Sequence, residues 1–262
     1  MIRSMYSGIS GLRNFQTKLD VIGNNIANVN TYGFKKGRTI FKDQFSQTVA
    51  GASAPGENRG GVNAKQVGLG SQLSAIDTIH APGSTQFTGN TLDLAIEGDG
   101  FFMVGTGDDM FYTRAGNFYL DNAGDLVDGD GSYLQGLTSP INIPSNATNM
   151  SIAQDGKVTY VQDSNLVEAG QLQLARFPNP GGLEKVGGNY FQVSPNSGDP
   201  VPGDPQGAGG HGAIKSGSLE MSNVDLAEEF TEMIVAQRGF QANTRIITTS
   251  DEILQELVNL KR

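Results

Sequence analysis

Cysteine is absent from this 262-residue chain, and histidine occurs only twice. Without thiols the chain can form neither disulfides nor thiolate metal sites. His80 stands before Ala-Pro-Gly and His211 lies within Gly-Gly-His-Gly, so we interpret both histidines as loop residues rather than ligands. The sequence therefore predicts no metal and no other cofactor.

Long apolar runs and positive charge are also scarce. No segment approaches the 18 consecutive apolar residues of a membrane-spanning helix, and the first residues lack the apolar core and cleavage site of an ordinary signal peptide. The chain carries 18 basic and 27 acidic residues, a net charge of −9. We therefore expect no membrane insertion and no nucleic-acid partner, because phosphate groups are bound by clustered Lys and Arg.

The usual catalytic motifs are missing as well. The chain contains no His-Glu-x-x-His, no Gly-x-Ser-x-Gly and no P-loop pattern. The acidic stretch 121–131 does not fit a calcium-binding EF-hand, because Ala123 occupies its third position and no glutamate stands at its twelfth. Hairpin turns explain this stretch better. An enzyme that uses carboxylates of a β domain remains an alternative, which a single carboxylate substitution that abolishes turnover would support.

Glycine is abundant in the chain, with 36 residues, and the hydrophobic content is only 37%. From Leu92 to Ser218, apolar and polar residues alternate between Asn-Ala-Gly, Asp-Gly and Gly-Asp-Gly breaks, which is typical of short strands joined by turns. We therefore expect a central all-β domain at residues 81–218. Residues 35–80 are polar and glycine-rich, so we expect an extended connector there, with a strand near Ser71–His80.

The N-terminal end has a different pattern, with apolar residues at steps of three and four. We expect a helix within residues 1–34, although Gly8, Gly11 and Gly23 each cost it about 1 kcal/mol relative to alanine. Such a helix should form only when its apolar seam meets a partner; the alternative is a helix that packs on the core of its own domain. The predicted N-terminal assembly seam comprises Met5, Ile9, Leu12, Phe15, Leu19, Ile22, Ile26 and Val29.

Residues 219–262 are predicted to form a second helix with the same spacing. Ser222 or Asn223 can cap its first turn, and Asp225 and Glu228 favour the positive end of the helix dipole. Because the two seams match in period, we expect the helices to pair as a coiled coil, which makes the fold class α+β. The predicted C-terminal assembly seam comprises Leu226, Phe230, Met233, Ala236, Phe240, Asn243, Ile247, Ser250, Leu254 and Leu257.

Asparagine is concentrated where the first helix is expected to end. It is a poor helix former that tolerates left-handed backbone, and a glycine after it provides another break. Buried asparagine amides can also set the register of paired helices. We therefore assign roles in ending the helix and in fixing register to Asn24, Asn25, Asn28, Asn30, Gly33 and Asn243.

Four segments together resemble the bacterial flagellar rod and hook family. They are LDVIGNNIANVNTYGFKKGR, TLDLAIEGDGFF, YTRAGNFYLDNAGDLV and SNVDLAEEFTEMIVAQRGFQANTRIITTSDEILQELVNLKR. The resemblance covers nearly the whole chain and is weakest from about residue 50 to 70. It implies a structural protomer whose copies form a hollow helical tube that transmits motor torque to the filament. The paired terminal helices would line the inner wall of this tube, and the β domain would form the outer wall.

The same resemblance implies the partners and the location of the protein. The partners would be further copies of the chain, the neighbouring axial proteins of the rod and the hook–filament junction, and the flagellar type III export apparatus. Export by that apparatus requires no cleaved signal peptide, which agrees with the sequence. We therefore expect the protein outside the cytoplasm, in the hook or the basal-body rod of the flagellum.

Within this family the resemblance favours the hook. The motifs DVIGNNIAN, TYGFKKG and MIVAQRGFQAN are closer to hook proteins. The opening MIRSMYSGISGL and the short chain are closer to the distal rod, a straight drive shaft, which is the alternative. A secreted adhesin with a β domain on a helical stalk is a more remote one, and it would form discrete trimers rather than filaments in electron micrographs.

Overall fold

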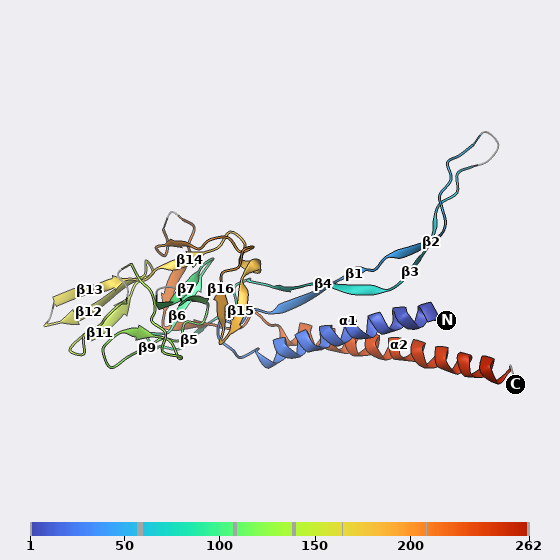
Figure 1. Ribbon diagram of the computed structural model, residues 1–262. Coiled ribbons are helices and arrows are strands. Elements are labelled where there is room, and N and C mark those ends of the chain that lie inside the picture. Colours follow the sequence, from blue (N-terminus) through green and yellow to red (C-terminus); the bar gives the residue numbers. More distant parts are fainter. Residues whose placement is uncertain are drawn as a thin grey trace. The chain divides into compact units, whose positions relative to one another are not determined.

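The computed structural model describes residues 2–56, 60–106, 109–137, 140–163, 165–207 and 209–260. It contains one helix near each end of the chain and a largely β region between them, which confirms the α+β class (Figure 1). The chain divides into two units. The helical unit comprises Met1–Ala27, Gly37–Asp77 and Asp225–Arg262, and the β unit comprises Asn28–Lys36 and Thr78–Val224.

The two helices of the helical unit are α1 (Ile2–Ala27) and α2 (Leu226–Asn259), and they lie side by side in opposite directions (Figure 1). The residue that caps α2 is Asp225, whose carboxylate accepts hydrogen bonds from the backbone N–H groups of Ala227 at 2.8 Å and Glu228 at 3.3 Å. The prediction that Ser222 or Asn223 is the cap was therefore wrong.

Both of those side chains make other bonds, because the chain is still part of the β unit at this point. The hydroxyl of Ser222 accepts from the N–H of Val224 at 3.3 Å. The amide oxygen of Asn223 accepts from the N–H of Lys36 at 2.8 Å, and its amide nitrogen donates to the carbonyl of Ile79 at 2.8 Å. The helix can begin only after these contacts end.

Helix α1 ends at Ala27, well before residue 34. The chain then turns within the β unit, where the N–H of Thr31 donates to the carbonyl of Asn28 at 3.2 Å. Gly33 has a φ of +68°, and a Cβ at this position would lie 2.5 Å from the backbone nitrogen of Ala115. Only glycine fits this close approach. Val29 lies beyond the helix, so its inclusion in a helical seam was wrong.

The strands between Gly37 and Thr78 pair with one another as a narrow ribbon, hereafter the ribbon, instead of forming a single extended connector. Strand β1 (Gly37–Asp43) pairs with β4 (Ser71–Thr78), and β2 (Ser46–Ala50) pairs in antiparallel fashion with β3 (Lys65–Gly68). Strand β4 coincides with the strand expected near Ser71–His80. Every residue of β2 and β3 is exposed, so this part of the ribbon has no core of its own.

The β unit is built on a six-stranded antiparallel sheet with the order β15-β16-β8-β7-β14-β17, beside a three-stranded sheet β11-β12-β13 and the pairs β18-β6, β19-β5 and β10-β9. A single turn of 3-10 helix, η1, covers Pro180–Gly182. The strands are β5 (Thr85–Phe87), β6 (Leu94–Glu97), β7 (Phe101–Thr106), β8 (Asp109–Thr113), β9 (Tyr119–Leu120), β10 (Leu126–Val127), β11 (Thr148–Ile152), β12 (Lys157–Gln162), β13 (Asn165–Gln171), β14 (Leu174–Arg176), β15 (Glu184–Gly187), β16 (Tyr190–Gln192), β17 (Val201–Gly203), β18 (Ala213–Ser216) and β19 (Ser218–Glu220).

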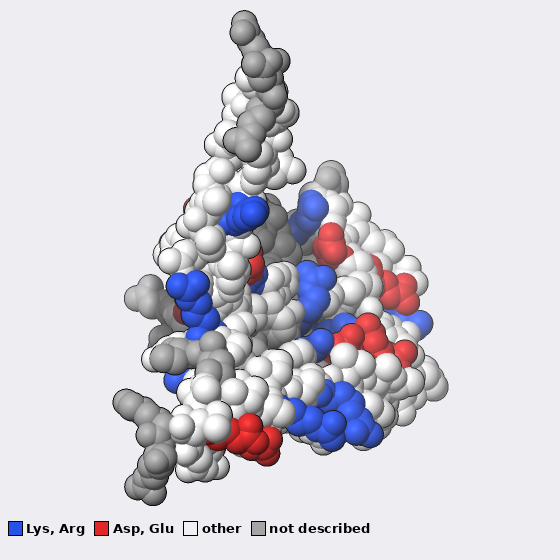
Figure 2. All heavy atoms as spheres, turned by 90° about the vertical axis from the view of Figure 1, so that its right-hand side faces the viewer, with Lys and Arg blue, Asp and Glu red and all other residues white. Residues whose placement is uncertain are grey.

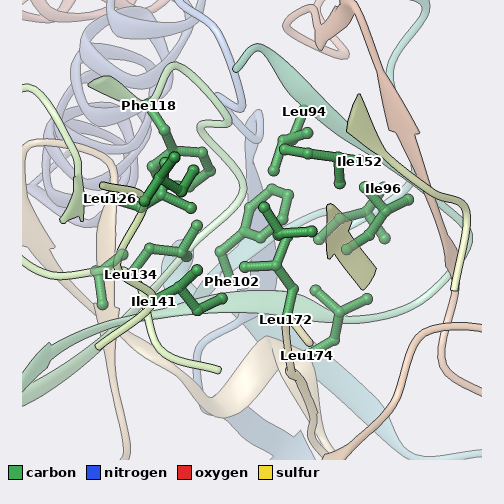
Figure 3. Packing of buried hydrophobic residues seen from close by; sticks show 14 of the residues in the cluster. Leu94, Ile96, Phe102, Phe118, Leu126, Leu134, Ile141, Ile152, Leu172 and Leu174 are labelled. Carbon is green, nitrogen blue, oxygen red and sulfur yellow. The ribbon is translucent and has the colours of Figure 1, made fainter. Parts of the chain in front are cut away.

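Strand β7 is buried on both faces, because alternate side chains of a strand point to opposite sides. Phe102 and Val104 belong to the larger hydrophobic cluster, and Phe101 and Met103 belong to a second one. Each fully buried side chain of this size contributes about 1.5–3 kcal/mol, so the β unit has a substantial core of its own. Figure 3 shows the larger cluster, which includes Leu94, Ile96, Phe118, Leu126, Leu134, Ile141, Ile152, Leu172 and Leu174.

The acidic stretch 121–131 begins with the turn that joins β9 to β10. The N–H of Asp121 donates to the carbonyl of Asp125, and the N–H of Gly124 donates to the carbonyl of Asp121, both at 2.9 Å. Among the described residues no three His, Asp or Glu side chains are grouped as metal ligands. Neither described helix combines the length and apolarity needed to cross a bilayer.

Candidate functional site

The helical unit brings most of the predicted site residues together, and glycine shapes the contact between its two helices. A Cβ added at Gly239 would lie 2.4 Å from Cζ of Phe15, and one at Gly11 would lie 2.9 Å from the amide nitrogen of Asn243. One at Gly8 would lie 3.4 Å from Ile247, which is ordinary contact. Sequence analysis treated Gly8 and Gly11 only as weaknesses of the helix. In the structure both face α2, and at Gly11 the approach leaves no room for a larger side chain without a shift of Asn243.

The predicted N-terminal seam lies mainly toward the interior of the helical unit. Ile22 is buried, and Ile9 is on the exposed side of the helix. The remaining helical members of the seam are half-buried: Met5, Leu12, Phe15, Leu19 and Ile26. This seam therefore faces α2 and the ribbon but is only partly covered by them.

The predicted C-terminal seam matches the inner face of α2 only in part. Met233, Ile247 and Leu254 are half-buried, and Ala236 and Ser250 are buried. Four large apolar members are exposed instead: Leu226, Phe230, Phe240 and Leu257. A pattern of threes and fours fits more than one helix face, and the face that meets α1 is the one with small and polar side chains.

Asn25 joins three segments of the helical unit and is only 2% exposed. Its amide oxygen accepts from the N–H of Gly37 at 2.9 Å, and its amide nitrogen donates to the carbonyl of the same residue at 2.9 Å. The amide nitrogen also donates to the carboxylate of Glu229 in α2 at 3.2 Å. Through these bonds one side chain links α1, the start of β1 and the first turn of α2.

The other asparagines have different surroundings. Asn24 and Asn30 are exposed, and Asn28 accepts a hydrogen bond from the hydroxyl of Thr31 at 3.2 Å. The amide of Asn243 donates to the carbonyl of Gly239 one turn earlier in α2, at 3.0 Å. Sequence analysis missed Asn14, which is buried and donates to the hydroxyl of Ser71 at 2.7 Å, joining α1 to β4. Its place within an apolar heptad was the only available signal.

An ion pair between Lys18 of α1 and Glu232 of α2 also links the two helices. Both side chains remain partly exposed to solvent. Pairs of this kind typically contribute less than about 1 kcal/mol. The position of the two helices therefore depends mainly on close packing and on the Asn25 contacts.

In the β unit, a buried charge cluster holds the segment that follows α1. Lys35 and Glu220 are 0% and 1% exposed, with 2.5 Å between Nζ and Oε1, and Arg114 lies 3.3 Å from the other carboxylate oxygen. Burial lowers the pKa of Lys35, although the charge of Glu220 acts in the opposite direction. The carbonyl of Glu220 also accepts from the N–H of Gly33 at 2.8 Å. The sequence pattern gave no sign of this cluster, because its three members lie far apart in the chain.

Large apolar side chains remain exposed on two sides of α2. On one side are Leu226, Phe230 and Ile234, which follow one another at steps of four. The helical period of 3.6 residues puts Val235, Ile246, Ile253, Leu257 and Leu260 on the opposite side. Apolar strips on both sides of a helix provide surfaces against which further helices can pack.

Comparison with known proteins agrees with this architecture. Residues 5–35 match the family described as flagella basal body rod protein, residues 95–160 match the flagellar hook protein FlgE/F/G D1 domain, and residues 215–260 match the flagellar basal body rod FlgEFG protein C-terminal family. The flagellar basal-body rod protein FlgG of Bacillus subtilis is 61% identical over 264 residues, which cover 100% of both chains. The chain belongs to the flagellar rod and hook protein family.

Two relatives from one organism, Borreliella burgdorferi, allow a rod protein and a hook protein to be compared with this chain. Its basal-body rod protein FlgG is 39% identical over 267 residues, and its hook protein FlgE is 32% identical over 442 residues, each with 100% of both chains covered. These similarities favour the distal rod, the alternative of the sequence analysis, over the hook. As a member of this family the chain is a structural protein of the flagellum, which confirms that it is not an enzyme.

Proposed function

We propose that this chain is the protomer of the distal rod, the straight drive shaft of the flagellar basal body. The observation that carries the proposal is that a rod protein is 61% identical to the chain from end to end. Hook relatives align over 442 and 464 positions, whereas this chain has 262 residues, so they contain long segments that it lacks.

The hook is the second candidate, favoured by a specific observation. A hook protein is 32% identical across the whole of this chain, so both termini and the β region have counterparts in it. The motifs that resemble hook proteins lie in these shared regions. Both functions require a polymer of this protomer, and they differ in whether the polymer is straight or curved.

The mechanism is mechanical and contains no chemical step. In the polymer, α1 and α2 would pair as a coiled coil along the inner wall of a hollow tube, with the β unit outside. Neighbouring protomers would cover the apolar strips of α2, and each side chain that becomes fully buried would contribute about 1.5–3 kcal/mol. Torque would pass through many identical contacts, because each protomer repeats the same set.

The helical unit would gain its full order only in the polymer. Within the chain the helices approach each other at glycines, against Phe15, Asn243 and Ile247, and most apolar residues of the two seams are only partly buried. The apolar strips on α2 stay exposed to water until neighbouring copies cover them. Folding of the terminal helices would therefore be coupled to assembly. Asn25 and Asn243, which lie where α1 and α2 meet, would keep the register of the pair during this process.

The polymer would also contact the neighbouring axial proteins at its two ends. The chain would reach its site through the flagellar type III export apparatus, the route that membership of the flagellar rod and hook family implies. Unfolded passage through a narrow channel is compatible with a chain that forms no disulfides. This route and these partners are parts of the proposal.

Deletion of the encoding gene, followed by electron microscopy of isolated flagellar bases, tests the proposal. Truncated rods are the result expected for a distal rod protein, and they should regain full length when the gene is restored on a plasmid. Complete rods that lack hooks would overturn the proposal in favour of the hook. Bases with intact rods and hooks would overturn both.

A further inference from the structure

A groove runs along α1 on the side of the helix that faces away from α2. It lies between α1 and the ribbon and has a volume of about 550 Å³. At 100° per residue, the groove-lining positions of α1 lie on the side opposite Gly8, Gly11 and Phe15, which contact α2. The apolar side chains that line the groove are Tyr6, Ile9, Leu69 and Leu73.

Within the described residues, the register of the two helices leaves the end of α2 beyond the start of α1. Gly8 faces Ile247, and Phe15 faces Gly239, so each step forward in α1 is matched by a similar step backward in α2. Since α1 begins at Ile2, its N-terminal end lies level with the turn of α2 around Glu252. Residues 253–260, hereafter the α2 overhang, extend about 12 Å further at 1.5 Å per residue.

The α2 overhang is apolar and strongly exposed. Leu260 is 83% exposed and Val258 is 65% exposed, and Ile253 and Leu257 are each about half exposed. The overhang cannot fold back into the groove of its own chain, because α2 is one continuous helix that extends past the start of α1. A second copy of the chain has a groove in which these side chains could be buried.

The charges of the two surfaces are opposite. Arg3 and Arg13 line the groove and are exposed, about 15 Å apart along α1 at 1.5 Å per residue. Glu256 is exposed within the overhang, and Asp251 and Glu252 are exposed just before it. Carboxylates near a helix C-terminus oppose the helix dipole, and arginines of a second copy would offset that cost. Figure 2 shows that basic and acidic side chains are both exposed on the face drawn there.

We propose that the α2 overhang of one protomer docks in the α1 groove of a second copy of this chain, with its apolar side chains against Tyr6 and Leu73. Glu256 within the overhang and Glu252 just before it would then lie on the side of Arg3 and Arg13. This inference rests on the proposed polymer and specifies one of its contacts. The groove follows α1 for about 15 Å and the overhang is about 12 Å long, so the two surfaces match in length, polarity and charge.

Cross-linking between two single-cysteine variants tests the contact, because the native chain has no cysteine to give a background. The Tyr6→Cys and Leu257→Cys variants of the full chain are mixed, polymerised and oxidised. We expect a disulfide-linked dimer in several-fold excess over the control mixture of Gln16→Cys with Leu257→Cys. Gln16 is exposed on α1 outside the groove.

A charge exchange gives an independent test. The Arg3→Glu and Arg13→Glu double variant should polymerise much less than the native chain, and adding Glu252→Arg and Glu256→Arg should restore polymerisation. Equal cross-linking in both mixtures, with normal polymers, would overturn the docking contact and leave the proposed function intact. The same conclusion would follow if the charge-exchange variants polymerised as well as the native chain. A chain that stays monomeric at every concentration would overturn both proposals.

Discussion

The helical unit and the β unit bury very different kinds of side chain. Among the described residues, the only buried apolar side chains of the helical unit are Ile22 and the small Ala236, whereas the β unit contains two dense hydrophobic clusters. Asn14, Asn25, Glu229 and Ser250 are buried in the helical unit. The β unit has a hydrophobic core formed within one chain, whereas the helical unit leaves apolar surface exposed.

The difference separates the part of the chain that is stable by itself from the part that the proposed assembly would complete. A core of alternating strand residues buries its apolar atoms inside one molecule. A pair of long helices that meets through small residues has little apolar surface buried and much exposed. Stability and assembly are therefore assigned to different parts of the chain, and substitutions in the two units should have separable effects.

The largest effect is expected in the β unit, at Glu220. Replacing Glu220 by alanine leaves the buried Lys35 and Arg114 without their shared carboxylate, and breaking a buried ion pair from one side costs about 3–5 kcal/mol. Denaturant unfolding followed by tyrosine signals measures the loss. The matched control is Glu97→Ala, which removes an exposed pair with Lys215 and should cost less than about 1 kcal/mol. Equal losses in the two variants would show that the buried cluster does not stabilise the β unit.

We expect His80 in the β unit to make the free energy of unfolding depend on pH, by up to about 3 kcal/mol. Burial, together with the charges of Lys35, Arg114 and Lys185, lowers the pKa of His80 from 6.5 to about 4. The unfolded chain therefore binds a proton that the folded chain excludes between these two pH values, and the free energy of unfolding falls by up to about 3 kcal/mol as the pH drops through this window.

The His80→Phe variant should lose this part of the pH dependence, because phenylalanine does not titrate and the ring of His80 already lies between Phe101 and Phe191. Denaturation midpoints measured from pH 7 to pH 4 compare the variant with the native chain. Parallel curves for the two proteins would contradict the assignment.

Two glycine substitutions should have opposite signs in the helical unit. At Gly239 an added methyl group meets the ring of Phe15, so Gly239→Ala should destabilise the helix pair by about 1–3 kcal/mol through overpacking. At Gly23 an added Cβ meets nothing within 4 Å, so Gly23→Ala should stabilise α1 by about 1 kcal/mol. Amide hydrogen exchange of the two helices measures both effects, and protection of the β unit should not change. Effects of the same sign would refute the proposed role of glycine in the contact.

A further modest effect is expected from Asn25 near the end of α1. Asn25→Ala leaves the N–H and carbonyl of Gly37 without their side-chain partner, at a cost of about 1–2 kcal/mol. We expect a higher critical concentration for polymerisation and an unchanged β unit, measured by sedimentation and circular dichroism. Gln16→Ala, at an exposed position of the same helix, is the control and should polymerise almost normally. If Asn25→Ala also polymerised normally, Asn25 would have no role in register.

Local patterns predicted the two helices and the strands of the β unit, but not the paired strands β1, β2 and β3. Steps of three and four predicted both terminal helices, alternation predicted strands from Leu92 onward, and the asparagine cluster marked the end of α1. The bounds were less accurate. Asp225 rather than Ser222 or Asn223 caps α2, because both of those side chains hold other segments of the β unit, and such contacts leave no trace in a local pattern.

The sequence by itself therefore determined the two helices, the β region and the family, because these depend on the spacing and identity of nearby residues. Only the tertiary structure decided which side of α2 meets α1, that Gly239 and Gly11 are contact points, and that Lys35 is buried with Glu220 and Arg114. The physical reason is that several faces of a helix can satisfy the same apolar period. The choice among them depends on close packing and hydrogen bonds between residues far apart in the chain.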